Sequence, residues 1–161
     1  MELTHFDESG NAQMVDVSDK TVTTRLAVAE GFITVSEAVC QCIETGSMKK
    51  GDVLAVAQMA AIMGAKQTAN LIPLCHPLNL SKVAVICQLD VSKRAIRIEA
   101  TVKTTGQTGV EMEALTAVQV GLLTVYDMCK AIDKTMVIGP VYLVEKSGGK
   151  SGHFINAHME R

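Results

Sequence analysis

Aromatic side chains are scarce in this chain. Its 161 residues include no tryptophan, two tyrosines and three phenylalanines. Proteins that hold single-stranded nucleic acid usually stack its bases on aromatic rings, so the composition argues against that class of binding protein. The formal net charge is only −2. The chain therefore has no positive field to attract DNA, RNA or an anionic membrane, and an anionic ligand would have to be held by local lysines.

The sequence also lacks a secretory leader and a transmembrane run. The amino terminus has no apolar segment of the secretory type, and the most apolar stretch is interrupted by Thr116, Gln119 and Thr124. The cysteines number five, and an odd count in such a sequence favours reduced thiols over a disulfide framework. We expect a soluble, cytoplasmic protein with no membrane or nucleic-acid partner.

Small and branched aliphatic side chains, by contrast, are abundant, and the apolar fraction is 48%. A chain of this length buries roughly two-thirds of the surface that it exposes when unfolded, which is enough for one core. We therefore expect a single domain over residues 1–161. Its ends, residues 1–13 and 153–161, are rich in turn formers and polar side chains and are expected to be flexible.

Residues 106–134 are predicted to form one long core helix. Thr108 is the expected N-cap, and Glu111 follows three residues later, as in a capping box. The polar side chains on this helix gather on one face, which contains Glu113, Thr116, Thr124 and Asp127.

Asp127 and Lys130 are three residues apart on this helix and are therefore neighbours. Two interpretations stay open: an ordinary exposed ion pair, or an acid and a base held for a reaction. Glu111 and Glu113 are equally compatible with simple complementation of the helix dipole. A rise of about 1.5 Å per residue separates Glu113 from Asp127 by roughly 21 Å. A site that uses both side chains would therefore need two chains.

The remaining elements follow from local patterns. Residues 21–33 are predicted to be a strand with a possible bulge at Gly31, and a helix capped by Thr34 should run to Gly46. Asp52 should cap a second helix that ends before Pro73. Strands are predicted over residues 82–89, 95–103 and 136–145.

This order matches a βαββαβ plan with one extra helix. We predict an α+β fold, with a ferredoxin-like antiparallel sheet and helices packed on one face. The other face of the sheet carries few charges, which favours a homo-oligomer.

Two prolines enclose a Cys-His pair in residues 71–78, L-I-P-L-C-H-P-L. A loop this stiff fixes the direction of its side chains, so His76 is a candidate general acid or base, metal ligand or structural histidine. No metal site is predicted, because the other histidines lie near the ends of the chain and Cys40 and Cys42 are too close in sequence to share an ion within a helix. The glycine-rich K-S-G-G-K-S-G of residues 146–152 fails the P-loop pattern at Val144, but it suits either a flexible tail or a fold over a phosphate.

Seven motifs in order give the chain a specific resemblance. They are M-V-D-V-S (14–18), K-G-D-V (50–53), L-I-P-L-C-H-P-L (71–78), T-G-x-T-G-V-E-M-E-A-L-T (105–116), Y-D-M-C-K-A (126–131), M-V-I-G-P-V (136–141) and K-S-G-G-K-S-G (146–152). Together they resemble the cyclic pyranopterin monophosphate synthase family of molybdenum cofactor biosynthesis.

The resemblance implies a lyase that converts 3′,8-cyclo-7,8-dihydroguanosine 5′-triphosphate to cyclic pyranopterin monophosphate and pyrophosphate. It implies that Asp127 and Lys130 are the general acid/base pair. It also implies substrate binding by a further set: Leu74, Cys75, His76, Met112, Glu113, Lys50, Lys66, Glu111 and Lys146. The resemblance implies no resident cofactor, and it is compatible with Mg²⁺ bound to the triphosphate. The implied assembly is a homohexamer, a trimer of dimers with the site at the dimer interface.

Two other functions fit part of the pattern. A non-catalytic, oligomeric nucleotide-binding regulator would use the same lysines to sense a triphosphate, but it leaves Asp127 beside Lys130 unexplained. A metal-dependent hydrolase would use His76 as a ligand, and metal analysis of the purified protein would identify it.

Overall fold

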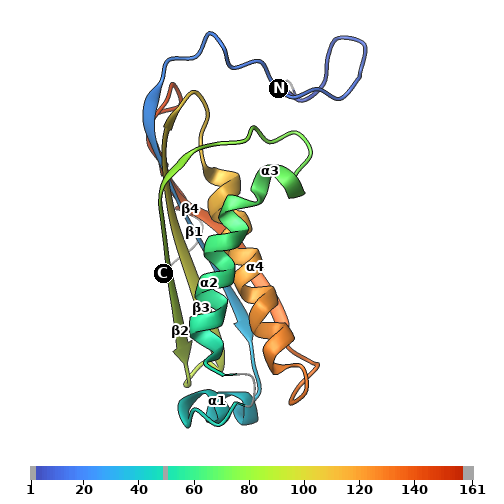
Figure 1. The fold of residues 1–161 in the computed structure, drawn as a ribbon, viewed down its shortest axis with the longest axis vertical. Coiled ribbons are helices and arrows are strands. Elements are labelled where there is room, and N and C mark those ends of the chain that lie inside the picture. The colour runs from blue at the N-terminus through green and yellow to red at the C-terminus, as the bar shows by residue number, and fades with distance from the viewer. Residues whose placement is uncertain (1–2, 49–50, 158–161) are drawn as a thin grey trace.

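The computed structural model describes residues 3–48 and 51–157. Its centre is an antiparallel sheet (Figure 1). The strands are β1 (Thr23–Thr34), β2 (Leu80–Asp90), β3 (Ala95–Gly106), β4 (Val137–Ser147) and β5 (Phe154–Ile155). They lie in the order β2-β3-β1-β4-β5, and every pairing is antiparallel. The first four strands have the order of the ferredoxin-like plan, so the predicted α+β class is confirmed.

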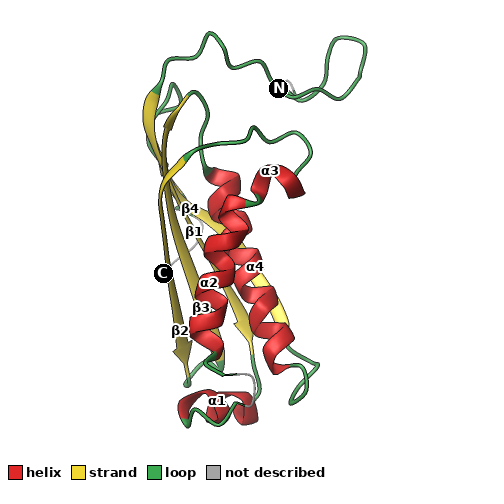
Figure 2. Ribbon diagram, viewed as in Figure 1, coloured by secondary structure: helices red, strands yellow, loops and turns green. Residues whose placement is uncertain are grey.

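The helices are α1 (Glu37–Glu44), α2 (Val53–Lys66), α3 (Thr68–Leu71) and α4 (Glu111–Cys129). α2 and α4 lie side by side on one face of the sheet (Figure 2), as the sequence predicted. The single turn α3 was not predicted, and neither was β5, which pairs with the end of β4. The core between the two layers consists of aliphatic side chains such as Ala29, Ile33, Ile98, Leu122 and Val125.

At Gly31 of β1 the packing of α4 on the sheet leaves no room for a side chain. A Cβ at this position would lie 2.7 Å from side-chain carbons of both Val118 and Val141. The register between β1 and β4 shifts between Gly31 and Ile33, but the extra residue lies on β4, between Ile138 and Val141. β1 pairs with β3 without any shift, so the bulge predicted at Gly31 was wrong. This glycine lets α4 lie close to the sheet.

The predicted ends of two helices were wrong. α4 begins at Glu111 with Val110 as N-cap and no side-chain cap, so Thr108 does not cap it. The reason is that β3 continues to Gly106, and the following residues are needed to turn the chain. At its other end α4 stops at Cys129, because the amides of Ile132 and Asp133 both bond to the carbonyl of Cys129 and close the helix.

α1 begins later than predicted. Thr34 is still part of β1 and pairs with Ala95 of β3, and the N-cap is Ser36, whose Oγ accepts a hydrogen bond from the Val39 amide. Gly46 follows the C-cap with φ +65°, as expected for the residue that ends a helix. The Asp52 cap of α2 is confirmed by its bond from the Ala55 amide.

The outer surface of the helix layer is apolar. Val56, Met59 and Met63 of α2 are exposed, and so is Leu123 of α4; Met59 has 64% of its surface exposed. These side chains belong to the two helices that already cover the sheet, and nothing in the described chain covers them in turn. An apolar patch of this kind is typical of a surface that another subunit covers.

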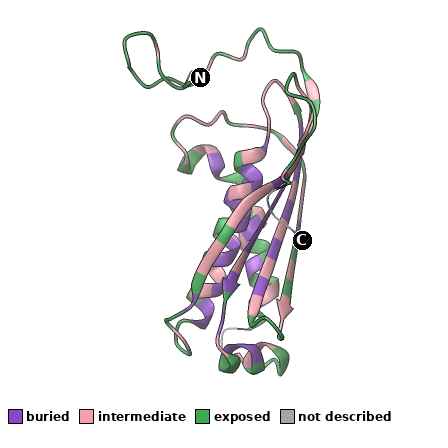
Figure 3. Ribbon diagram, turned by 180° about the vertical axis from the view of Figure 1, so that it is seen from behind, coloured by how far each residue is buried: buried purple, intermediate pink, exposed green. Residues whose placement is uncertain are grey.

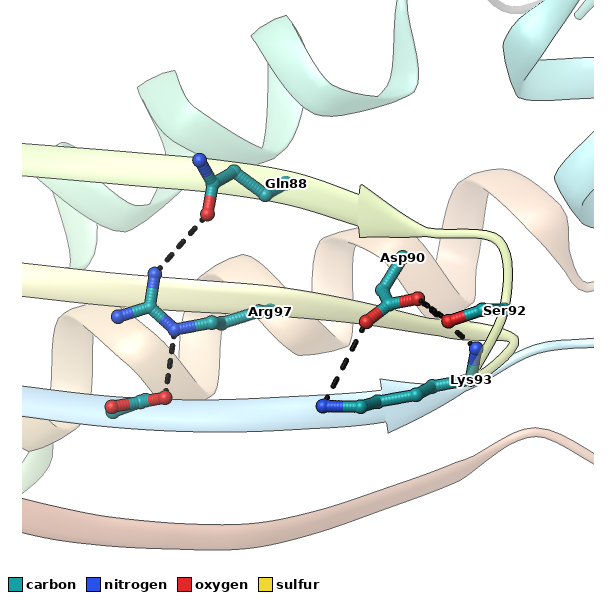
Figure 4. A network of polar contacts seen from close by, with 6 residues as sticks. Gln88, Asp90, Ser92, Lys93 and Arg97 are labelled. Carbon is teal, nitrogen blue, oxygen red and sulfur yellow. Dashed lines mark hydrogen bonds and ion pairs between the residues drawn. The ribbon is translucent and has the colours of Figure 1, made fainter. Parts of the chain in front are cut away.

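The other face of the sheet is polar at its centre. No helix of the described chain covers it (Figure 3), yet Glu30 is only 3% exposed. The guanidinium of Arg97 donates to Glu30 at 2.7 Å and to Glu99 at 2.5 Å, and it also reaches Gln88 (Figure 4). One guanidinium on this face is therefore shared between two carboxylates.

Candidate functional site

A small cavity lies between the loop of residues 71–78 and the amino-terminal end of α4. Its volume is about 140 Å³. It brings together six residues of the predicted substrate-binding set, namely Leu74, Cys75, His76, Glu111, Met112 and Glu113. Its other lining residues are His5, Leu78, Thr108 and Gly109. The proline-enclosed loop therefore presents its Cys-His pair to α4.

Glu113 is the most deeply buried of the ionisable groups in the small cavity, with 4% of its surface exposed. Burial raises the pKa of Glu113 to about 7, and the nearby Glu111 carboxylate acts in the same direction. Near neutral pH this side chain can therefore either donate or accept a proton. Burial also raises the pKa of the Cys75 thiol, which disfavours the thiolate and a nucleophilic role.

His76 is oriented by the backbone of a distant segment. Its Nε2 lies 2.7 Å from the carbonyl oxygen of Val15, within the M-V-D-V-S motif. A carbonyl oxygen only accepts, so Nε2 carries the proton and Nδ1 of the neutral ring is the acceptor. His76 is therefore held in one tautomer by a segment that is distant in sequence.

A large cavity adjoins the small one. Its volume is about 630 Å³, and it shares Thr108, Gly109 and Glu111 with the small cavity. Lys146 reaches across it to Glu111, with 2.9 Å between Nζ and Oε1. These two residues were both predicted to belong to the site, and the structure brings them together.

Three further cationic side chains line the large cavity, Lys20, Arg25 and Lys150. Lys150 belongs to the glycine-rich segment that the sequence analysis considered as a fold over a phosphate, whereas Lys20 and Arg25 were missed. Arg25 Nε and Thr23 Oγ1 are buried and have no hydrogen-bond partner in the described part of the chain. A buried donor without a partner is rare and indicates a ligand or ordered water. Arg25 was missed because it lies within a strand, where a single cation carries no motif.

The glycine-rich loop after β4 fits closely around Arg25. Gly148 and Gly149 have φ of +94° and +78°, in the left-handed region that glycine favours. A Cβ at Gly149 would lie 2.2 Å from the Arg25 guanidinium, so only glycine leaves room for that side chain. The loop also contributes Lys150 and Ser151 to the cavity, so it lies beside the cationic wall.

Asp127 and Lys130 lie at the opposite end of α4 from Glu113. They form an ion pair of 2.6 Å, with 59% and 49% of their side chains exposed, and line neither cavity. The hydrogen bond that Lys130 donates to Asp127 raises the pKa of Lys130, so the lowered lysine pKa that desolvation would produce is absent from this subunit. Within one chain the predicted acid/base pair is therefore separate from the predicted substrate site.

Two further predicted residues lie elsewhere. Lys66, at the end of α2, lines an open cavity of about 430 Å³ together with Lys82 and Leu78. Leu78 also lines the small cavity, so the cavity that contains Lys66 is its neighbour, but Lys66 does not line the small cavity itself. Lys50 lies outside the described residues.

A cavity of about 510 Å³ on the opposite face of the sheet is a weaker candidate. Its charged residues are already matched: Lys93 pairs with Asp90, and Arg97 with Glu30 (Figure 4). Asp90 also accepts from Ser92. Binding an ion here would first break these pairs.

Within residues 3–48 and 51–157, no helix combines the length and apolarity needed to span a membrane. Within the same residues, no group of three or more His, Cys, Asp or Glu side chains is placed to hold a metal ion.

The fold and the two joined cavities define a small α+β protein with titratable groups beside a wall of cationic side chains. The chain belongs to the MoaC family, whose sequence profile matches residues 14–149.

Curated relatives match over nearly their whole length. Cyclic pyranopterin monophosphate synthase of Desulfitobacterium hafniense is 60% identical over 155 residues, covering 96% of this chain and 94% of the relative. The enzyme of the same name from Dinoroseobacter shibae is 60% identical, covering 94% of this chain and 96% of the relative. The one from Roseiflexus sp. is 59% identical, covering 96% and 98% respectively.

Proposed function

We propose that this protein is a cyclic pyranopterin monophosphate synthase of molybdenum cofactor biosynthesis. It converts 3′,8-cyclo-7,8-dihydroguanosine 5′-triphosphate to cyclic pyranopterin monophosphate and releases pyrophosphate. The observation that carries the proposal is the junction of the two cavities at Glu111, with acid-base groups on one side and cations on the other. A nucleotide with a ring at one end and phosphates at the other matches that division.

The ring system of the substrate would occupy the small cavity. His76 offers an acceptor at Nδ1, and Glu113 can donate or accept near neutral pH. A heterocycle that carries both N–H donors and carbonyl acceptors suits such a pair. Leu74 and Met112 supply apolar surface beside these polar groups.

The triphosphate would occupy the large cavity. Four cationic side chains (Lys20, Arg25, Lys146 and Lys150) line it against one carboxylate, Glu111. The guanidinium of Arg25 can hold two phosphate oxygens at once, and the lysines supply point charges. When a ribose oxygen bonds to the α-phosphorus and pyrophosphate leaves, negative charge grows on the leaving group. Cations fixed beside it stabilise that charge, and Mg²⁺ bound to the phosphates would act alongside them.

Asp127 and Lys130 would reach this substrate from a second subunit. α4 places them roughly 21 Å from Glu113 along its axis. A two-fold axis through the apolar surface of the helix layer reverses α4, so its carboxyl end in one subunit meets its amino end in the other. The exposed Met59, Met63 and Leu123 lie on this surface and would be covered by the contact.

A site shared between two subunits would also remove water from Asp127 and Lys130, which the single subunit does not do. Exposed in one subunit, Asp127 and Lys130 would lose water in the interface, and the lysine pKa would then fall toward the range useful for proton transfer. The pair then moves protons while the purine-derived ring opens and recloses and the hydroxyl that forms the cyclic phosphate loses its proton. Three such dimers would form the hexamer.

Pyrophosphate release tests the proposal directly. Purified protein is incubated with the cyclised dihydroguanosine triphosphate and, separately, with GTP, and the fluorescent pterin formed on oxidation is measured in parallel. Release from the cyclised substrate alone is expected. Tight binding without release would support a nucleotide-binding regulator instead, and hydrolysis of both nucleotides would support a hydrolase.

Two variants test the acid/base assignment. Asp127→Asn and Lys130→Ala should each lower turnover by about 10² or more, the usual scale for a general acid or base. Both side chains are exposed in the subunit, so each variant chain should still fold, which its circular dichroism spectrum would show. Near-normal turnover in both variants would remove the role proposed for them.

A further inference from the structure

The segment from residue 3 to residue 18, here called the strap, is internally bonded. Asp7 Oδ1 accepts hydrogen bonds from the amides of Ser9 and Asn11 at 2.9 and 2.8 Å. Phe6 pairs with Ala12 as an isolated bridge. The amide of Gln13 donates to the His5 carbonyl at 2.8 Å. These contacts fix the backbone at His5 although the strap contains no helix and no named strand.

The strap is attached to the body on both sides of the small cavity. The Val15 carbonyl accepts from His76, in the loop of residues 71–78. The Ser18 carbonyl accepts from Gln107 Nε2 at 3.1 Å, in the turn that leads into α4. Figure 1 shows the strap running along the same end of the molecule as α3 and the start of α4. The strap therefore joins the two segments that form the cavity.

His5 is the strap residue that lines the small cavity. All the other lining residues lie far from it in the sequence. Its imidazole makes no hydrogen bond to another described residue, in contrast to His76. An imidazole offers one donor and one acceptor, or two donors when protonated, and it can also stack on a flat heterocycle. His5 thus brings an uncommitted polar ring to a cavity whose other imidazole is already fixed.

We propose that His5 contacts the heterocyclic ring of the substrate, and that the strap is the part of the site that positions it. The inference rests on the proposed function for the identity of that ring. Asp7 is then a positioning residue, because its carboxylate closes the turn that holds the His5 backbone. The phosphates would lie in the large cavity, whose lining residues include none of the strap.

The test compares His5→Ala, Asp7→Ala and Glu8→Ala. Loss of one ring contact should raise KM for the cyclised nucleotide about tenfold in His5→Ala. Asp7→Ala should raise KM less than His5→Ala does. The variant loses the hydrogen bonds that close the turn but keeps the imidazole of His5. Glu8 is exposed on the same turn and makes no bond to it, so Glu8→Ala is the matched control and should stay within about twofold of the unsubstituted protein.

Binding is measured separately from turnover in the Lys130→Ala background. There His5→Ala should weaken the affinity for the cyclised nucleotide about tenfold and leave the affinity for inorganic pyrophosphate unchanged, since pyrophosphate needs only the large cavity. A merely structural role for His5 would weaken both ligands or lower the unfolding temperature.

The two proposals fail in different ways. Absence of pyrophosphate release from the unsubstituted protein would overturn the proposed function. Normal release together with KM and affinity within about twofold in His5→Ala would overturn the role of His5 and leave the function standing.

Discussion

Replacing Glu113 by glutamine should make the stability of the folded protein fall less as the pH rises. Burial raises the folded-state pKa of Glu113 to about 7 from 4.5. Below pH 4.5 the carboxyl is protonated in both the folded and the unfolded state. Between these two values only the unfolded state ionises, so the folded protein loses stability as the pH rises. Above pH 7 the full loss remains.

The size of the effect follows from the pKa difference. One pKa unit corresponds to about 1.4 kcal/mol, so burial of Glu113 costs at most about 3.5 kcal/mol above pH 7. Glutamine has nearly the same shape but cannot ionise, so Glu113→Gln avoids this loss. In the proposed dimer, the Asp127–Lys130 pair of a second subunit would lie near Glu113. The pair carries no net charge and excludes water, so the pKa of Glu113 stays raised.

The measurement is urea unfolding of both proteins between pH 4.5 and 8. Circular dichroism suits the chain, because it has no tryptophan to report by fluorescence. Protein concentration must be constant, since the stability of an oligomer depends on it. The free energy of unfolding of Glu113→Gln relative to the unsubstituted protein should rise with pH, and Glu8→Gln controls for the loss of an exposed carboxylate. A difference that is independent of pH, or that grows toward acid, would refute the reasoning.

Three more variants test the packing of the site and the core. Arg25→Lys should raise KM for the nucleotide about tenfold or more in steady-state assays, because the two-pronged phosphate contact is lost; an unchanged KM would remove Arg25 from the site. Gly149→Ala should also raise KM about tenfold by displacing Arg25. Gly152 has a similar positive φ, and a Cβ there would meet nothing within 4 Å, so Gly152→Ala should leave KM unchanged. Equal effects of the two substitutions would contradict the proposed fit of the loop around Arg25. Gly31→Ala should lower the free energy of unfolding by about 1–3 kcal/mol because its Cβ would overlap Val118; urea unfolding without a change would contradict that close approach.

Most of the fold was predictable because it depends on periodic patterns. The clean alternation of residues 95–103 identified β3, and the Asp52 cap located the start of α2. The errors occurred at element ends, where competing bonds decide. Thr34 is a good N-cap by type, yet its backbone pairs with a neighbouring strand and the helix starts after Ser36.

The site was predictable where its residues are neighbours in sequence. Leu74, Cys75 and His76 occur together in a stiff loop, and α4 presents Met112 and Glu113 to it. Residues that depend on tertiary placement were not predictable. His5 and Arg25 have no motif of their own, and only the folded chain brings them beside the cavities. The exposure of Asp127 likewise depends on where α4 ends.

The central claim is a site shared between two subunits, and mixing two inactive variants tests it most directly. Glu113→Gln and Asp127→Asn are purified separately, mixed, allowed to exchange subunits, and assayed for pyrophosphate release from the cyclised nucleotide. In a two-fold dimer each mixed pair contains one doubly altered site and one intact site, so random exchange should restore about a quarter of full activity. No recovery, with exchange verified by differently tagged subunits, would contradict a shared site and place Asp127 outside the reaction centre.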